Sequence, residues 1–382
     1  MSSFHRQAGT CEIITSAPRL AEVAALLSRQ TEIAVDMEMD SLHHYREKVC
    51  LVQVSTREQS WLIDPLALTS LEPLAAPLAD PDIIVVMHGS DYDIRSLHRD
   101  YGITVTNLFD TMIAARFLGI TEFGLAALLK ARFGIELDKK YQKADWSKRP
   151  LTREMCAYAS ADTSDLLALY DQLRNELEEK DRMHWLEEEG RLVCQARVTE
   201  KDGPLFIYCK GAGKLRGHSL AVLEELLQLR DQQAELLDRP PFKVLSADTL
   251  IDVAENRPQT LHELSFFKGM TPGQLQRHGS GMLSAIERGM ATAENRLPRF
   301  PRTVKKEILE RVKERLKNLK VWREHYSHKL GLDPGVLAPN WLLEAIADTE
   351  GASIDELAAI PGMREWQKRL YGENLAHILA MA

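Results

Sequence analysis

The sequence lacks the paired cysteines and the long apolar runs that mark disulfide-bonded, zinc-binding and membrane-spanning proteins. Its five cysteines include no Cys-x-x-Cys pair, which argues against a structural zinc site and a disulfide framework. No apolar run approaches the roughly 18 residues that a membrane-spanning helix needs. Residues 1–16 contain no apolar stretch of the signal-peptide type. We therefore expect a cytoplasmic protein with no membrane partner.

Positive charge is scarce for a protein that binds a polyanion, since the formal net charge is −8. The deficit belongs to residues 1–200, which carry 22 Lys and Arg against 32 Asp and Glu. Residues 201–382 carry 26 against 24, and eleven of these basic residues lie between Arg296 and Arg323. We expect contacts with nucleic-acid phosphates in this basic segment. A merely solvated charged face is the alternative.

The length of 382 residues predicts two or three domains. In the first part, apolar runs of strand length alternate with segments of helical spacing, which predicts an α/β domain with a mixed sheet. The expected strands are 32–39, 49–55, 60–63 and 83–87, and the expected helices are 18–29, 91–101, 111–117, 123–133 and 152–179. After about residue 210 the pattern predicts only short helices, punctuated by glycine and proline.

The C-terminal part contains an internal repeat. Seven positions between 264 and 286 recur 93 residues later, between 357 and 379, among them Gly269 and Gly362. Upstream, VLSADTLI at 244–251 matches VLAPNWLL at 336–343. These are two copies of one small helical domain, and the basic segment lies between them.

Asp36 and Glu38 stand two residues apart in the expected strand 32–39. Residues i and i+2 of a strand project from the same face, so both carboxyl groups point together while Val35 and Met37 point to the opposite layer. Adjacent carboxylates resist ionisation unless a cation neutralises them. Hard divalent cations such as Mg²⁺ and Mn²⁺ take oxygen ligands of this kind. For the pair alone, solvated acids on an exposed edge strand are the alternative.

Two later segments add acids to this pair. Tyr158 and Asp162 lie four residues apart in the expected helix 152–179 and therefore share a face; a tyrosine at the core edge with an exposed aspartate is the alternative. His88 follows an apolar strand, and Asp91 and Asp93 begin the next helix. An acid at a helix start can be simply an N-cap, which suits Asp91 and leaves Asp93 in the first turn.

Taken together, these segments resemble the three exonuclease motifs of the DEDD superfamily, in its tyrosine-containing branch. The segments are VDMEMD at 35–40, HGSDYD at 88–93, FDT at 109–111 and YASAD at 158–162. Residues 137–163 resemble the signature shared by ribonuclease D and the nuclear 3′-exonuclease of the exosome. The repeated module resembles the helicase-and-ribonuclease-D C-terminal (HRDC) domain. The resemblance covers nearly the whole chain.

This resemblance implies an α/β RNase H-like exonuclease domain with a mixed β-sheet at residues 1–205. It implies a first small all-α HRDC-like domain at 212–292, and a basic linker helix with a second such domain at 293–382. The implied function is that of a 3′-5′ exoribonuclease. It would trim RNA 3′ ends, such as those of tRNA precursors, by hydrolysis that releases nucleoside 5′-monophosphates.

Roles of single residues follow from the same resemblance. It implies that two divalent metal ions, Mg²⁺ or Mn²⁺, are bound by Asp36, Glu38, Asp93 and Asp162. It implies that Tyr158 orients the attacking water. Asp110 matches a further aspartate of the family, which we interpret as a helix cap or a support of the site.

Polar residues near these motifs are candidates for substrate binding. They belong to the loop after the first acidic strand, to the end of strand 83–87 and to the basic run before the Tyr158 helix. The candidates are His43, Tyr45, Arg46, His88, Lys140, Lys143 and Arg149. A purely structural role is the alternative for each: a solvated loop, a hydrogen-bonded buried histidine or a solvated charge run.

The repeated domains are expected to supply RNA affinity, with the basic segment and the nearby Trp322, Tyr326 and Trp341 as contacts. Core aromatics and a solvated face are the alternative. We expect a monomer. Two other functions stay open: a 3′-5′ DNA exonuclease of the Werner type, and a nucleic-acid-binding scaffold with vestigial acids. Two repeats without a helicase motif favour the ribonuclease D type, and the intact acids disfavour the scaffold.

Overall fold

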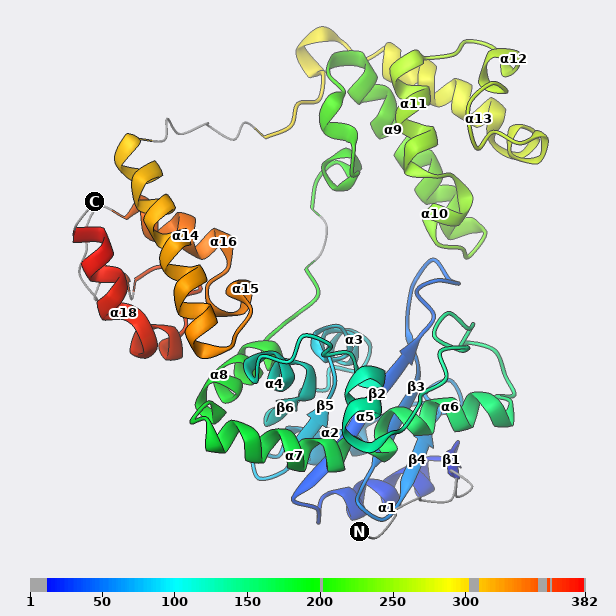
Figure 1. The fold of residues 1–382 in the computed structure, drawn as a ribbon. Helices are drawn as coiled ribbons and strands as arrows, with labels where there is room; N and C mark the ends of the chain where they lie inside the picture. The colour runs from blue at the N-terminus through cyan, green and yellow to red at the C-terminus, as the bar shows by residue number, and fades with distance from the viewer. Residues whose placement is uncertain (1–11, 200–201, 302–308, 350–355, 358, 381–382) are drawn as a thin grey trace. The chain divides into compact units, whose positions relative to one another are not determined.

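The computed structural model describes residues 12–199, 202–301, 309–349, 356–357 and 359–380. The chain divides into two compact units (Figure 1). The first contains residues 1–39, 49–198 and 306–382, and the second contains residues 40–48 and 199–305. No described helix is both long and apolar enough to cross a membrane. The domain boundaries expected from the sequence stay a prediction.

A six-stranded mixed sheet forms the centre of the first unit. Its strands stand in the order β1-β4-β3-β2-β5-β6. They are β1 (Glu12–Ile14), β2 (Glu32–Met39), β3 (Val49–Ser55), β4 (Ser60–Ile63), β5 (Ile84–Met87) and β6 (Leu108–Asp110). Strand β2 pairs antiparallel with β3 and parallel with β5. The predicted mixed sheet is confirmed, whereas β1 and β6, at three residues each, are too short to leave a periodic pattern.

Helices cover both faces of this sheet (Figure 1). On one face, α1 (Ala17–Leu27) and α3 (Asp91–Tyr101) share a core with Val35 and Met37 of β2. On the other face, α6 (Arg153–Ser164) contacts β2, β3 and β4, and α7 (Leu166–Glu179) contacts β2 and β5. The remaining helices of this α/β part are η1 (Glu72–Leu74), α2 (Ala75–Ala79), α4 (Thr111–Phe117), α5 (Leu125–Phe133) and α8 (Met183–Cys194).

The helix expected over 152–179 is in fact two helices. Helix α6 ends at Ser164 and α7 begins at Leu166. Asp165 between them has φ −110° and ψ 5°, which lies outside the α-helical region. The single-helix prediction is therefore wrong at this residue. The apolar spacing continues across it, so the pattern alone could not reveal the break.

The first unit also contains the second copy of the repeat, packed against the α/β part. Its helices are α14 (Glu310–Leu330), α15 (Pro334–Leu337), α16 (Asn340–Asp348) and α18 (Glu365–Ala380). The rings of Trp185 in α8 and Trp366 in α18 stack with centroids 4.5 Å apart, and Phe117 meets both edge-on. The Glu188 carboxylate accepts hydrogen bonds of 2.7 and 3.0 Å from the first backbone N–H groups of α18, which have no partner within the helix. The two parts thus share one core.

The second unit is the first copy of the repeat. It consists of η2 (Leu205–Tyr208), η3 (Ala212–Lys214), α9 (Gly217–Leu236), α10 (Pro241–Val244), α11 (Ala247–Asn256), α12 (Leu261–Leu264), α13 (Pro272–Met290) and η4 (Glu294–Arg296). Helices α9 and α13 approach closely at Gly289, where a Cβ atom would lie 2.5 Å from the Cα of Val222. Among the described residues from 202 onward there is no strand, as the sequence predicted.

The shared core of the first unit can be tested with two tryptophans of the same domain. Trp366 is 2% exposed and Trp341 is 49% exposed. We expect Trp366→Ala to lower the free energy of unfolding by about 3–5 kcal/mol, because a buried aromatic side chain and its stack on Trp185 are lost. Trp341→Ala should cost about 1 kcal/mol or less. Urea denaturation followed by circular dichroism measures both, and equal losses would contradict the assignment of Trp366 to the core.

Candidate active site

Strand β2 presents Asp36 and Glu38 on the face of the sheet that α6 covers. Both residues are half-buried, and Met37 between them is buried on the opposite face. Their cross-strand partners on β3 are Gln53 and Leu51. Leu51 packs in the cluster beneath α6. The period-2 alternation of the strand therefore places the acid pair between the sheet and this helix.

Helix α6 brings Tyr158 and Asp162 to the same place. The helix is fixed to the sheet next to the aspartate, because the Thr163 and Ser55 hydroxyl oxygens lie 2.7 Å apart and both residues are buried. One turn earlier, Tyr158 lies half-buried on the same helical face. The charges of Asp162, Glu38 and Asp36 all act on its hydroxyl, so the tyrosine and these acids border one space.

Two aromatic residues hold the Tyr158 ring from the preceding segment. Its centroid is 5.8 Å from that of Tyr141 and 5.9 Å from that of the buried Trp146. Sequence reasoning did not select Tyr141. Its only signal was an aromatic residue inside the basic run before α6.

Of the two acids that begin α3, Asp93 faces β2. Its charge raises the pKa of Asp36. Asp91 is exposed and its carboxylate is paired with Arg95, one turn further along the helix. The structure thus brings together the four acids that the sequence selected, from β2, α3 and α6.

Asp110, which is 1% exposed, is hydrogen-bonded both to the start of α4 and to the turn before α3. Its carboxylate accepts hydrogen bonds from the backbone N–H groups of Met112 and Ile113 at 2.8 and 3.2 Å, which caps α4. It also accepts from the backbone N–H of Gly89 at 3.0 Å and from both the N–H and the hydroxyl of Ser90 at 2.8 Å. Gly89 has φ +70°, which favours glycine. The turn that leads into Asp93 is therefore fixed by a buried carboxylate.

The four acids are held in conditions that oppose their ionisation. Burial, and then the charges of Asp93, Asp162 and Glu38, raise the pKa of Asp36 well above its ordinary value. Burial and the charges of Asp162 and Asp93 raise the pKa of Glu38 to about 9. Burial is the main cause that raises the pKa values of Asp93 and Asp162 to about 7. Burial and the nearby acids also raise the pKa of the Tyr158 hydroxyl. This is the electrostatic signature of a functional site.

The donor set fits divalent cations by its chemistry. Hard cations prefer carboxylate oxygens, and a cation would remove the repulsion among these groups. Gln53, opposite Asp36, is 0% exposed, and neither polar atom of its carboxamide has a hydrogen-bond partner among the residues that the structure describes. A buried amide without a partner beside the acids indicates that a polar ligand, an ion or water completes this site. Among the described residues, however, no three or more His, Cys, Asp or Glu side chains already form a metal-binding group.

The loop 40–48 belongs to the second unit, where its polar groups are bonded to the end of α9. The Tyr45 hydroxyl donates to Asp231 at 2.9 Å. The Arg46 guanidinium donates to Glu235 at 2.8 Å. The Tyr45 ring is also packed against the core of that unit. These contacts favour a structural role for Tyr45 and Arg46, which the sequence proposed as substrate contacts; His43 is half-buried in the same loop.

The Arg149 guanidinium is hydrogen-bonded within the protein. Its guanidinium donates to both carboxylate oxygens of the buried Asp64 at 2.6 and 2.7 Å and to the Cys50 carbonyl at 2.7 Å. This arrangement favours a structural ion pair over the proposed substrate contact.

The remaining candidates differ in exposure. Lys140 and Lys143 are exposed, and the Lys140 Nζ lies 5.2 Å from the Tyr141 ring centroid. His88 Nδ1 lies 2.9 Å from the Thr111 hydroxyl oxygen, and burial lowers the pKa of the imidazole. His88 is therefore held as a hydrogen-bonded histidine, whereas both lysines stay candidates on the strength of their exposure.

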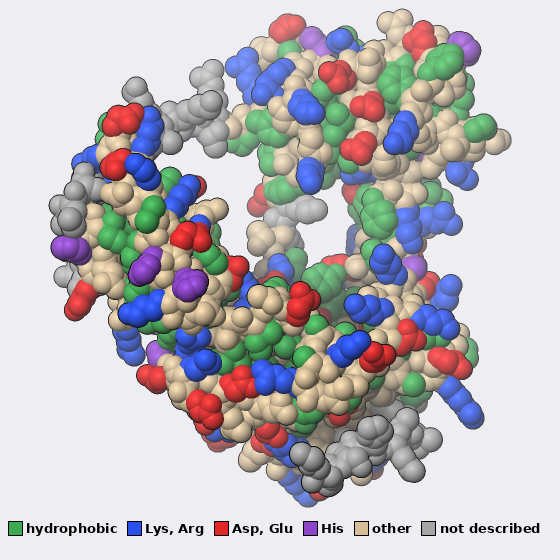
Figure 2. Space-filling model, viewed as in Figure 1, with side chains coloured by type: hydrophobic (Ala, Val, Ile, Leu, Met, Phe, Trp, Pro, Cys, Tyr) green, Lys and Arg blue, Asp and Glu red, His purple; other side chains and the backbone are tan. Residues whose placement is uncertain are grey.

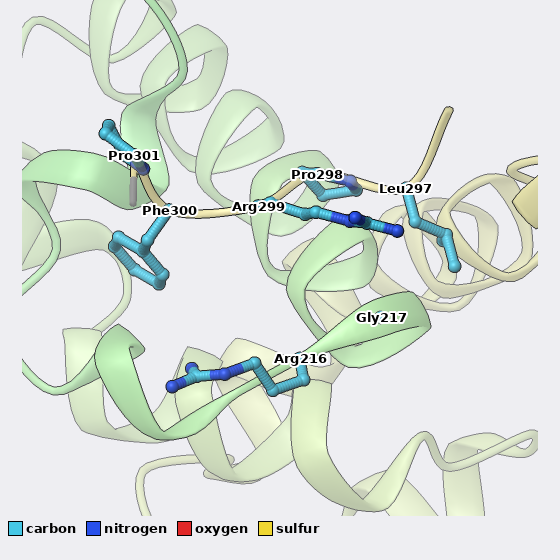
Figure 3. A pocket seen from close by; sticks show the side chains of 7 residues that line it. All are labelled: Arg216, Gly217, Leu297, Pro298, Arg299, Phe300 and Pro301. Atoms are coloured by element: carbon cyan, nitrogen blue, oxygen red, sulfur yellow. The ribbon is translucent and has the colours of Figure 1, made fainter. Parts of the chain in front are cut away.

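Charge on the surface is mixed. On the face seen in Figure 2, acidic and basic side chains are interspersed. Within the basic segment, Arg315 is buried and donates to the carbonyls of Thr349 and Leu379. Lys313 is paired with Glu310 one turn away. In the second unit, residues 297–301 with Arg216 and Gly217 line a pocket. The Arg216 side chain extends below the Phe300 ring, and the Arg299 side chain extends toward Leu297, away from that ring (Figure 3). The part of this segment at 302–308 lies outside the described residues.

Comparison with known proteins identifies the parts of the chain. Residues 11–178 match the family described as a 3′-5′ exonuclease, and residues 219–286 and 312–379 each match the HRDC domain. Ribonuclease D of Pseudomonas paraeruginosa is 30% identical over 358 residues, which are 92% of this chain and 93% of that protein.

The chain belongs to the ribonuclease D family. The crystal structure of Escherichia coli RNase D, described as an exoribonuclease involved in structured RNA processing, is 26% identical with a TM-score of 0.72, and the match covers 97% of this chain and 99% of that one. Mouse exosome complex component 10 is 34% identical over 259 residues, 65% of this chain. The match spans only 29% of the mouse protein. The chain thus combines a ribonuclease D-type 3′-5′ exonuclease domain with two HRDC domains, and the resemblance and fold class expected from the sequence are confirmed.

The raised pKa values predict how stability depends on pH in the absence of divalent cations. In the folded protein the pKa of Glu38 is about 9 and those of Asp93 and Asp162 about 7, against roughly 4 in an unfolded chain. Between these limits the folded state binds more protons, so this contribution to stability falls as pH rises from about 4 to 9. We therefore expect Glu38→Gln to have a higher unfolding temperature than wild type when both are measured in EDTA. The difference should be larger at pH 8.5 than at pH 5.5. The exposed Glu72→Gln is the matched control, and a gain that did not grow with pH would contradict the shift.

Proposed function

We propose that this chain is a 3′-5′ exoribonuclease that hydrolyses the terminal phosphodiester bond of RNA and releases nucleoside 5′-monophosphates. The observation that carries the proposal is a cluster of four carboxyl groups whose ionisation is opposed by burial, and at Asp36 also by the charges of the other three, within a domain of the 3′-5′ exonuclease family. A fold with no catalytic use for these acids would gain stability by losing them.

The proposed cofactors are two divalent cations, Mg²⁺ or Mn²⁺, held by Asp36, Glu38, Asp93 and Asp162. When bound, such ions supply a nucleophile at neutral pH and neutralise charge on the phosphate and leaving oxygen. The carboxylates would be the ligands, and three elements, β2, α3 and α6, hold them in place. Asp110, through the turn at Gly89 and Ser90, would keep Asp93 in position.

Tyr158 would orient the attacking water. Burial and the surrounding acids raise its pKa, so its hydroxyl stays protonated at neutral pH and keeps a proton to donate in a hydrogen bond. The aromatic contacts with Tyr141 and Trp146 restrict its ring. The residue is thus suited to holding a water molecule, and poorly suited to acting as a phenolate nucleophile or base.

The proposed substrates are structured RNAs, in particular tRNA 3′ ends, in the cytoplasm. The support is the likeness to the E. coli enzyme described as acting in structured RNA processing and the presence of two HRDC domains. We also propose that the chain acts as a monomer. Lys140 and Lys143, exposed before α6, are the remaining candidates for phosphate contacts.

The catalytic assignment predicts a sharp difference between two groups of variants. Asp36→Asn should reduce RNA hydrolysis in Mg²⁺ by about 10³-fold or more, since several kcal/mol of charge stabilisation are lost. Tyr158→Phe should reduce it by about 10²–10⁴-fold. Glu72→Gln, an exposed acid of the same domain, should leave the rate unchanged. Release of 5′-monophosphates from labelled RNA measures all three rates, and wild-type hydrolysis by Asp36→Asn would refute the assignment.

The substrate assignment predicts polarity and sugar preference. A tRNA with a 3′ extension and a 5′ label should shorten stepwise from its 3′ end in Mg²⁺ or Mn²⁺, while DNA of the same sequence should persist. Gel electrophoresis and chromatography of the products report both. Equal digestion of DNA would replace the proposal with a 3′-5′ DNA exonuclease, and no digestion of either would replace it with a binding scaffold.

A further inference from the structure

At one position of the repeat, the first copy has a small buried residue where the second copy has a large aromatic one. Thr249 in α11 and Trp341 in α16 occupy matching places in VLSADTLI and VLAPNWLL. Both lie against a glycine of the repeat at positive φ, Gly269 and Gly362. A Cβ atom on Gly269 would lie 2.5 Å from the Thr249 hydroxyl oxygen, and one on Gly362 would lie 2.7 Å from the Trp341 ring. The neighbouring glycine is equivalent in the two copies, but the side chains are not.

The threonine has a structural role that the tryptophan lacks. Thr249 is 4% exposed and donates a hydrogen bond of 2.9 Å to the carbonyl of Lys268. Trp341 is 49% exposed. The other aromatics near the basic segment are core residues, since Trp322 and Tyr326 stack on each other and join the shared core. Trp341 therefore stands out as a large, half-exposed aromatic side chain that has no counterpart in the first copy.

Trp341 borders a pocket between the second HRDC domain and α4. The pocket has a volume of about 230 Å³, below the range of small-molecule sites and suited to a single planar ring. Beside the tryptophan, α4 contributes Arg116 and Phe117. Glu189 and Arg364 also line it, and they neutralise each other in a two-bonded pair at 2.7 and 3.0 Å. The charge of Arg116 is thus left unbalanced among the ionic groups of the pocket.

Arg116 is half-buried, and its guanidinium makes no hydrogen bond or ion pair with any described residue; it lies 5.7 Å from the Phe123 ring centroid. An arginine without an acidic partner next to an open aromatic face is the combination that binds single-stranded nucleic acid, by phosphate contact and base stacking. Helix α4 also connects the acid cluster to this pocket. It begins at Asp110, which fixes the turn before Asp93, and reaches Arg116 six residues later, about 9 Å along the axis.

We propose that this pocket binds an unpaired base of the RNA substrate, stacked on Trp341, with an adjoining phosphate at Arg116. The proposal rests on the proposed exoribonuclease function and assigns to the second HRDC domain a contact that its sister copy does not make. Its ligand class is an unpaired ribonucleotide within a longer RNA.

Binding without hydrolysis tests the proposal directly. The probe is a 5′-fluorescein RNA hairpin with an unpaired 3′ tail, titrated in EDTA with the full chain and followed by fluorescence anisotropy. Trp341→Thr, which installs the residue of the sister copy, should weaken binding by about 5- to 100-fold, whereas Trp341→Phe should retain most of the affinity. Arg116→Gln should lower the slope of log affinity against log salt by about 0.7.

Matched controls separate this site from general effects. Phe266→Ala removes an aromatic that is 74% exposed on the first HRDC domain, and Arg29→Gln removes an exposed arginine of the exonuclease domain; both should bind RNA as wild type does. Thermal unfolding checks that each variant is folded. If Trp341→Thr binds the tailed hairpin within about twofold of wild type, the pocket is not an RNA site. Failure of the proposed function would be seen separately, as a wild-type chain that does not shorten the same hairpin in Mg²⁺.

Discussion

The repulsion among four half-buried carboxyl groups is the constraint on which the rest of the exonuclease domain depends. Asp36, Glu38, Asp93 and Asp162 come from three elements. Burial opposes the ionisation of all four, and the charges of Asp93 and Asp162 add to this at Asp36 and Glu38. Holding them together requires burial on the opposite side of each element. Val35 and Met37 supply it behind β2, the Thr163–Ser55 contact locks α6, and the buried Asp110 fixes the turn into α3. The domain thus uses a well-packed fold to maintain an unfavourable cluster, the usual relation between stability and a functional site.

The sequence predicted the parts of this site that local periodicity controls. Strand alternation was enough to place Asp36 and Glu38 on one face, and helical spacing was enough for Tyr158 and Asp162. Helical spacing also held a signal for Asp93 over Asp91, because Arg95 lies one turn after Asp91 and pairs with it. Gln53 was an available signal, a polar residue within the apolar strand VCLVQVS, but its importance depends on pairing with Asp36 across the sheet.

Long-range partners explain the rest of what sequence reasoning could not find. Tyr45 and Arg46 form bonds with residues about 190 positions away, and Arg149 bonds with Asp64, 85 positions away. A loop or a basic run looks free in one dimension, and its acidic partners are known only once the chain has folded. The two repeats make the same point: their patterns match, and nothing in the pattern of the second copy shows that it shares a core with the α/β part, through Trp366 and Trp185.

These ion pairs also bear on how an acidic chain can hold RNA. Part of the positive charge that the sequence offered for phosphates is paired within the chain, by Arg46 on the surface and by Arg149 and the buried Arg315. With a net charge of −8, long-range attraction of a polyanion is weak, and it is screened beyond about 8 Å at physiological salt. Affinity must then come from short-range contacts that do not depend on net charge. Stacking on an exposed aromatic such as Trp341 is of this kind, because every base presents a π face whatever the sequence. A nuclease that relied on such contacts would hold unpaired RNA ends in preference to duplex, since only unpaired bases leave a face free to stack.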